Sequence, residues 1–266
     1  MDLIAESRMA STLQNRERKF TTTSNLGAGV PVDTHAVHLP RASGRGRQAT
    51  LTGVQILATG SYVPDRIVRN EDLADLGYDA DWIVQRTGIH ERRHAPPEQA
   101  TSDVGYEAAS ACLESAGISP AEIDLILVAT MTPDYPMPST ACLIQERLGC
   151  LAPAMDLNVA CAGFMFAMIT GMQFVKTGCS RRVLVIGVDL MSRVVNPADK
   201  KTYPLFGDGG GAVLLGPAES DRGLLAYTLG AEGDAAKILS QPAGGTREPL
   251  TAEALAAGRQ FIHMEG

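Results

Sequence analysis

The stretch "PAMDLNVACAGFMFAMITGMQFVKTGCSRRVLVIGVD", residues 153–189, contains two strand patterns separated by one helical pattern. PAMDLNVA predicts a short strand, and RRVLVIGVD, residues 181–189, is an apolar run typical of a strand buried on both faces. Residues 164–175 would be apolar on nearly every face of a helix, which is typical of a helix packed inside a protein. We therefore expect a strand–helix–strand unit with Cys161 where the first strand gives way to the helix.

The same alternation continues on both sides of this unit. Further strands are predicted at residues 54–58, 123–130 and 209–216. Helices are predicted within residues 70–77, 79–89, 101–117 and 138–149, with Thr101 or Ser102 capping the third and glycines ending each. Because the connections are short, this order predicts an α/β fold with a largely parallel or mixed sheet between layers of helices.

Composition limits the classes of function. The 266 residues are 45% hydrophobic and 20% charged, with a formal net charge of −7. Residues 1–50 are the basic part, and we expect them to be a disordered or mis-annotated extension, with a targeting segment as an open alternative. The acidic remainder, residues 51–266, argues against nucleic acid as the main ligand. No stretch approaches a membrane span in length, so we expect a soluble, cytoplasmic protein without membrane contact.

Cys161 differs from the other cysteines in its placement. The five cysteines form no C-x-x-C pair, which favours free thiols in a reducing compartment. At a helix N-terminus, unpaired N–H groups and aligned peptide dipoles favour a thiolate, and the small residues Ala160, Ala162 and Gly163 leave room for a substrate. A cysteine thioester divides an acyl transfer into two easier steps. From placement alone Cys161 could equally be a packed structural cysteine.

The remaining four cysteines are expected to be structural and inert. They are Cys112, Cys142, Cys150 and Cys179.

Five motifs follow one another from about Val54 onward: GSYVP, DWIVQRTGIHER, VATMTPDYPMPSTACLIQ, DLNVACAGFMFAM and FGDGGGAVLLG. Together they resemble those of beta-ketoacyl-ACP synthase III, the condensing enzyme that starts type II fatty acid synthesis. The resemblance implies a thiolase-like fold built from two similar α/β halves, with residues 51–266 as the N-terminal half, and a homodimer. It implies that Cys161 takes an acyl group from acyl-CoA and condenses it with malonyl-acyl carrier protein, which loses carbon dioxide to give 3-ketoacyl-ACP. No bound cofactor or metal is implied.

The resemblance also assigns roles in binding CoA. Trp82 would stack on the adenine and Arg86 would hold the nucleotide, which suits a flat indole and a cation. The alternative is that Trp82 anchors a helix and Arg86 is a surface charge. Where the family often has arginine before F-G-D-G, this sequence has Lys200 or Lys201, which keeps the charge without the planar fork.

Two further positions match the family's acyl pocket, Phe206 and Met137, the latter reaching across the dimer. Because some members carry phenylalanine where Met137 stands, the slimmer side chain predicts a primer larger than acetyl. The glycines of residues 207–211 precede a strand, so the dinucleotide fingerprint does not fit. We expect instead a close backbone approach beside the active site, with Asp208 fixing the loop.

The resemblance breaks at the end of the sequence. The family's catalytic His and Asn lie beyond the motif that FIHMEG begins to match, and the sequence given stops at Gly266. We therefore expect a fragment of a longer synthase, incomplete by itself, and we expect surface or loop roles for its five histidines. The open alternatives are a related starter-unit or polyketide acyltransferase and a non-catalytic ACP-binding remnant.

Overall fold

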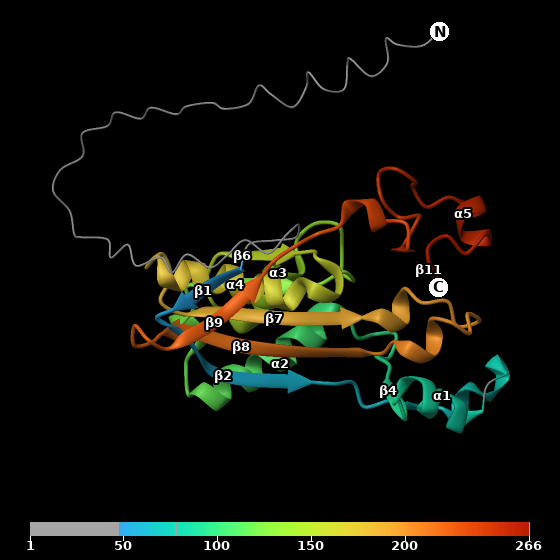
Figure 1. The fold of residues 1–266 in the computed structure, drawn as a ribbon, viewed down its shortest axis with the longest axis horizontal. Helices are drawn as coiled ribbons and strands as arrows, with labels where there is room; N and C mark the ends of the chain where they lie inside the picture. The colour runs from blue at the N-terminus through green and yellow to red at the C-terminus, as the bar shows by residue number, and fades with distance from the viewer. Residues whose placement is uncertain (1–47, 78, 266) are drawn as a thin grey trace, which may run out of the picture. The chain divides into compact units, whose positions relative to one another are not determined.

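A five-stranded mixed sheet forms the centre of the fold (Figure 1). The computed structural model describes residues 48–77 and 79–265. In spatial order the strands are β2 (Val54–Tyr62), β8 (Asp208–Pro217), β7 (Val183–Leu190), β5 (Leu125–Ala129) and β6 (Ala154–Leu157). β5 is parallel to both β6 and β7, whereas β8 is antiparallel to β7 and β2. The predicted α/β class with a mixed sheet is confirmed.

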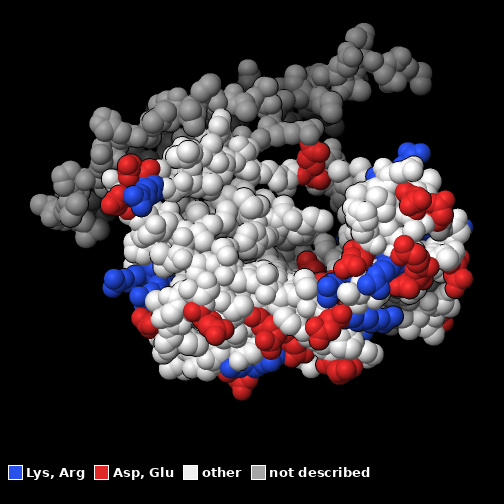
Figure 2. Space-filling model, turned by 90° about the horizontal axis from the view of Figure 1, so that it is seen from below, with Lys and Arg blue, Asp and Glu red and all other residues white. Residues whose placement is uncertain are grey.

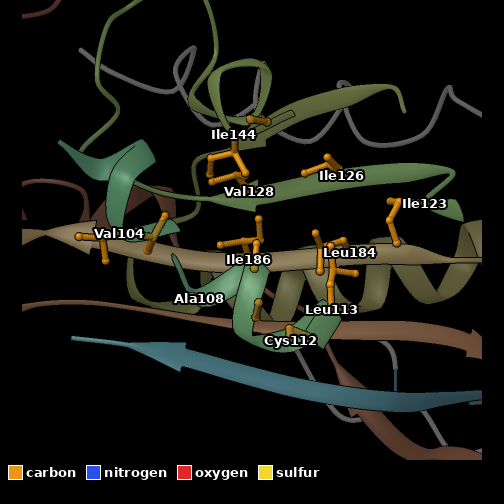
Figure 3. Close-up of a cluster of buried hydrophobic side chains, with 14 of the residues drawn as sticks. Val104, Ala108, Cys112, Leu113, Ile123, Ile126, Val128, Ile144, Leu184 and Ile186 are labelled. Carbon is orange, nitrogen blue, oxygen red and sulfur yellow. The ribbon is translucent and has the colours of Figure 1, made fainter. Parts of the chain in front are cut away.

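Helices cover the two faces of this sheet. On one face α2 (Thr101–Ala116) and α3 (Thr140–Leu148) bury a core with β5 and β7, drawn in Figure 3. On the other face α4 (Gly163–Lys176) packs together with the paired strands β1 (Gln48–Thr52) and β9 (Gly223–Thr228). The residues of β5 are all buried, as expected for a strand that is apolar on both faces. The predicted strands of the sheet are confirmed.

Smaller elements extend from the sheet ends. β3 (Ile67–Arg69) pairs with β4 (Glu91–Arg93), and between them lie the 3₁₀ helix η1 (Glu71–Leu76) and α1 (Ala80–Thr87). β10 (Leu239–Ser240) pairs with β11 (His263–Met264), with α5 (Ala252–Ala256) between them. The remaining 3₁₀ turns are η2 (Pro120–Glu122), η3 (Ala160–Ala162), η4 (Met191–Arg193), η5 (Tyr203–Leu205) and η6 (Gly233–Ala235). In Figure 1, α1 and α5 lie at the end of the sheet where β7 finishes.

Two boundaries differ from the sequence-based expectations. The structure places Ala100, not Thr101 or Ser102, at the N-cap of α2. That prediction was wrong because both hydroxyls bond elsewhere: Thr101 Oγ1 donates to the Thr132 carbonyl at 2.5 Å, and Ser102 Oγ donates to Asp134 at 2.6 Å. β1 begins at Gln48, so residues 48–50 belong to a strand; the expectation for the rest of residues 1–50 lies outside the described residues.

α4 packs closely on the sheet through its glycines. A Cβ added at Gly171 would lie 3.0 Å from side-chain atoms of Leu215 and Val183, and one at Gly163 would lie 3.2 Å from the Ala129 Cβ. At both positions a larger side chain would press on the sheet. The helix was expected to pack inside the protein, but Ala160 and Cys161, just before it, are exposed in this chain. Gly163 is buried at the start of the helix, and most of its other buried residues lie in the later turns, from Ala167 to Val175.

No helix in the described part of the chain is long and apolar enough to cross a membrane. Large apolar side chains are nevertheless exposed, among them Ile56, Leu57, Met155 and Met165, each between 41% and 47% accessible. Figure 2 shows one face on which charged side chains lie mostly around the margin of a broad uncharged area.

Candidate functional site

The candidate site lies where the parallel strands β5, β6 and β7 end. Cys161 follows β6 in the 3₁₀ turn η3, which leads directly into α4. Asp189 is the next-to-last residue of β7, and residues 130–132 follow β5 directly. Carboxyl ends of adjacent parallel strands meet at one edge of a sheet, which is the usual place for a site in this class of fold. The turn is tight, since Ala160 has a φ of +46°.

Cys161 lines a cavity of about 270 Å³, here called the methionine chamber. Its apolar wall is formed by Met131, Met191, Val194, Phe206, Leu239 and Ile262. Asp189, Ser240 and Gln241 supply polar groups at its edge. An apolar chamber that opens on a nucleophile can hold a hydrocarbon chain next to the reacting atom. Cys161 and Phe206, which the sequence analysis selected, are thus brought together.

A second space of about 490 Å³, here called the glycine chamber, shares Cys161 and Asp189 with the first. Glycines 60, 187, 207, 209 and 211 line it. Without side chains at these positions, the backbone itself forms part of the wall around the sulfur. The close backbone approach predicted for residues 207–211 is confirmed. Among the described residues that line either chamber there is no histidine.

Asp189 is the main polar anchor between the strand ends. Its Oδ1 accepts hydrogen bonds from the Met131 and Thr132 backbone N–H groups at 2.8 and 3.2 Å. The same oxygen accepts from the Thr130 and Thr132 hydroxyls at 3.0 and 3.1 Å. Burial raises the pKa of the Asp189 carboxyl, and these four hydrogen bonds oppose that rise by stabilising the anion.

A second buried carboxylate, Asp208, fixes the loop before β8. It accepts hydrogen bonds from the Ala95 N–H at 2.7 Å, the Ser192 N–H at 2.8 Å and the Ser192 hydroxyl at 2.6 Å. These bonds connect the loop to the segment after β4 and to the turn after β7. The loop-fixing role predicted for Asp208 is confirmed.

The residues expected to bind CoA gather around α1. Asp79 caps this helix by accepting from the Trp82 N–H at 2.6 Å, and the Arg86 guanidinium carbon lies 5.7 Å from the centre of the Trp82 ring. A Cβ added at Gly77, just before α1, would lie 2.9 Å from Lys200 Nζ. The loop that carries Lys200 then continues to Phe206 in the methionine chamber. One loop therefore connects the surroundings of α1 with Cys161.

Met137 is the predicted site residue that this chain does not bring to Cys161. Its side chain is 82% exposed, and it lines neither chamber. Its assignment across a dimer stays a prediction.

The other thiols, and the histidines at positions 90, 94 and 263, line neither chamber, while His35 and His38 lie outside the described residues. All five cysteines are free, but only Cys112 and Cys150 are buried. Exposure of Cys142 and Cys179 contradicts the expectation that they are packed. Burial raises the pKa of Cys112, which keeps it protonated. His94 lies in the loop after β4, within the surface or loop roles predicted for the histidines, but it is buried there and packs edge-on against Tyr203, with ring centres 5.7 Å apart. Within residues 48–77 and 79–265 no cluster of His, Cys, Asp or Glu could hold a metal ion.

Comparison with known proteins agrees with this geometry. The family described as 3-Oxoacyl-[acyl-carrier-protein (ACP)] synthase III matches residues 155–233. A beta-ketoacyl-[acyl-carrier-protein] synthase III of Rhodopirellula baltica is 58% identical over 234 residues, covering 81% of this chain and 68% of the relative. The chain belongs to the beta-ketoacyl-ACP synthase III family. The synthase III of Caldanaerobacter subterraneus is 48% identical over 213 residues, covering 79% of this chain and 64% of that protein.

Solved synthase III structures share the fold. That of Aquifex aeolicus VF5 superposes with a TM-score of 0.69 at 36% identity, covering 80% of this chain and 65% of that chain. A priming beta-ketosynthase from the R1128 polyketide pathway gives 0.69 at 31% identity, covering 82% and 64%. The predicted family, its acyltransferase class and the fold class are confirmed. The chain spans about two thirds of the length of the synthase III relatives it matches.

Proposed function

We propose that this synthase III chain takes part in starting fatty acid synthesis, with Cys161 as the acyl acceptor. The Cys161 thiolate attacks the thioester carbonyl of acyl-CoA, the carbon–sulfur bond to CoA breaks, and the CoA thiolate leaves and takes up a proton. Malonyl-acyl carrier protein then loses carbon dioxide, its enolate carbon attacks the Cys161 thioester, and the Cys161 thiolate returns. The product is 3-ketoacyl-ACP. Acyl-CoA and malonyl-ACP are substrates, so no cofactor is proposed.

The observation that carries this proposal is the shared wall of the two chambers. Cys161 lines both, with an apolar wall in the methionine chamber for the acyl chain and a backbone-lined wall in the glycine chamber. A nucleophile between these two spaces can hold a primer in one while a second thioester approaches through the other.

CoA binding is proposed for Trp82, Arg86 and Lys200. Trp82 is 39% exposed beside a guanidinium on the same helix, an arrangement that suits an adenine ring and a phosphate. Lys200 lies next to Gly77, and its loop leads to Phe206. We propose that CoA binds beside α1 and extends along this loop, so that its thioester reaches the Cys161 sulfur.

Phe206 is proposed to contact the acyl chain, and Met137 to do so from a second copy in a homodimer. The high exposure of Met137 leaves its side chain accessible to such a partner. We also propose that residues 51–266 are the N-terminal half of a duplicated thiolase-like architecture and that the protein works in the cytoplasm, in keeping with its free cysteines.

The proposal is tested by incubating the chain with acyl-CoA, then with malonyl-ACP, and weighing the carrier protein by mass spectrometry. Formation of 3-ketoacyl-ACP that is lost in Cys161→Ala supports the whole sequence. An acyl group on Cys161 without any ketoacyl product supports the acyl transfer and contradicts condensation by this chain.

A starter-unit role in polyketide synthesis is the second candidate, because the R1128 priming beta-ketosynthase matches over 82% of this chain at 31% identity. A panel of starter acyl-CoAs with fatty-acid and polyketide carrier proteins separates the two. Product formation only with a polyketide carrier would favour the second candidate.

A further inference from the structure

Four hydrogen bonds from the loop formed by residues 130–132 converge on a single oxygen atom. Asp189 Oδ1 accepts from two backbone N–H groups and two hydroxyls of this loop, at 2.8 to 3.2 Å. Met131, in the middle of the loop, lines the methionine chamber together with Cys161. The position of one chamber wall therefore depends on a carboxylate from the neighbouring strand.

The strand register explains why Asp189 reaches this loop. β5 and β7 are parallel neighbours with Ala129 opposite Gly187. Asp189 is two residues past Gly187, and Met131 is two residues past Ala129, so both lie at the same level beyond that pair. The loop follows β5 directly, beyond the last paired residues of the two strands. There the Asp189 carboxylate, in place of a backbone carbonyl of β7, accepts the hydrogen bond from the Met131 N–H.

Other bonds hold the ends of the loop but not its centre. Thr132 Oγ1 accepts from the Leu190 N–H at 2.9 Å, and the Thr132 carbonyl accepts from Thr101 Oγ1 at 2.5 Å. The Met131 N–H is bonded to Asp189. Without an acceptor at position 189, the Met131 amide would lose its partner, and the Thr132 amide would keep only its 3.1 Å bond to Thr130 Oγ1. A backbone amide left without a partner away from water is costly enough to move a loop.

We propose that Asp189 is a positioning residue that sets which acyl chains the methionine chamber accepts, by fixing Met131 in its wall. The proposal rests on the proposed function in one respect, that the chamber holds an acyl chain during transfer to Cys161. Asp189 transfers no proton and forms no bond to the substrate in this role. Its effect is on chain-length selectivity.

Selectivity can be measured without acyl-CoA, by labelling Cys161 with alkyl methanethiosulfonates. The Cys161 thiolate attacks the sulfenyl sulfur, a disulfide to the alkylthio group forms, and methanesulfinate leaves. The ratio of the decyl to the methyl labelling rate of the folded protein then reports the room beside the sulfur. Cys142, which is exposed and lines neither chamber, is an internal reference in the same peptide map.

Four variants of the 266-residue chain test the assignment. Asp189→Leu removes the acceptor, and Asp189→Asn keeps an oxygen that can accept from the same four donors. Thr132→Val removes one donor without altering the wall of the methionine chamber, because Thr132 does not line it. Asp124→Ala is the matched control: at the opposite end of β5 and β7, Asp124 accepts from the Arg181 and Arg182 N–H groups at 2.7 and 2.8 Å.

We expect the decyl-to-methyl ratio at Cys161 to rise roughly tenfold in Asp189→Leu, the size of effect that small changes in an apolar pocket produce. Thr132→Val should raise it less, and Asp189→Asn and Asp124→Ala should leave it as in wild type. An unchanged or lower ratio in Asp189→Leu, or an equal rise in Asp124→Ala, overturns the proposal. Repeating the comparison with long and short acyl-CoA separates the two proposals: if wild-type Cys161 takes alkylthio groups but no acyl group, the proposed function fails and the positioning role of Asp189 stands.

Discussion

The Arg86 guanidinium carbon lies 5.7 Å from the centre of the Trp82 ring, one turn further along α1. At this distance the cation is attracted to the face of the indole. The Trp82 side chain is 39% exposed, so the pair lies at the surface with a ring and a positive charge directed by one helix. The Trp82 ring and the Arg86 cation are therefore already in position for a ligand that carries a base and phosphates.

Replacement of Trp82 by alanine should weaken acyl-CoA binding without slowing acyl transfer. We expect the acyl-CoA concentration for half-maximal acylation of Cys161 to rise about tenfold, equivalent to about 1.4 kcal/mol, with the rate at saturation unchanged. Rates of adduct formation across an acyl-CoA series measure both quantities. Trp82→Phe keeps a flat ring and should lose much less. A lower rate at saturation with unchanged half-maximal concentration would show that Trp82 acts on the chemistry and not on binding.

Gly60 should be a position where alanine is not tolerated. A Cβ there would lie 2.3 Å from the Cys112 backbone N and 2.4 Å from the Ala108 carbonyl oxygen, so β2 and α2 would have to separate. Overpacking of this kind costs about 3 kcal/mol or more of unfolding free energy. Urea denaturation provides the measurement.

Gly211 is the matched control for Gly60, since it lies across the same ladder, where Ser61 pairs with it. A Cβ at Gly211 would meet only the Gly60 carbonyl oxygen, at 3.8 Å. Gly211→Ala should therefore change stability by less than about 0.5 kcal/mol. Equal losses in the two variants would contradict the packing of β2 on α2.

His94 should make the fold sensitive to acid. Burial lowers the pKa of His94, and the positive charges of Arg66, Arg92 and Arg193 lower it further, while Asp208 acts in the opposite direction. Because the folded-state pKa lies below the ordinary value of 6.5, its stabilising contribution is present above pH 6.5 and is lost as pH falls through the folded-state value.

We therefore expect the free energy of unfolding to decrease below pH 6.5 with a contribution from His94 of up to about 1.4 kcal/mol per pH unit. This contribution should vanish in His94→Gln, whatever the variant's stability at neutral pH. His90→Gln, at an exposed position nearby, is the control. Urea titrations at pH 5 to 8 measure the slope. If His94→Gln and wild type lose stability in parallel, the buried imidazole is not the cause.

The sheet could be predicted from sequence because its strands carry the signal themselves. Every residue of β5 is buried, so its apolar run reflects burial on both faces. Small residues and a helix start made Cys161 a candidate nucleophile, and the family resemblance decided between that role and a structural one. Phe206 required the family resemblance, since a single phenylalanine before a glycine run has no chemical signature of its own.

Features that depend on distant contacts could not be predicted. The N-cap of α2 was missed because Thr101 and Ser102 bond to a loop far along the chain. Asp189 was not predicted as a site residue, because one polar residue at the end of an apolar strand pattern carries no distinct signal in the sequence. Only the register of β5 and β7 shows that its carboxylate meets Met131 and Thr132. The burial of His94 depends on its packing against Tyr203, more than a hundred residues later.

The central claim is that Cys161 is the acyl acceptor, and intact-protein and peptide mass spectrometry after incubation with acyl-CoA tests it most directly. We predict one acyl group per chain, located on Cys161 and absent in Cys161→Ala, with the exposed thiols of Cys142 and Cys179 unmodified. Acylation of Cys142 or Cys179 while Cys161 stays bare, or equal acylation of Cys161→Ala, would contradict the account.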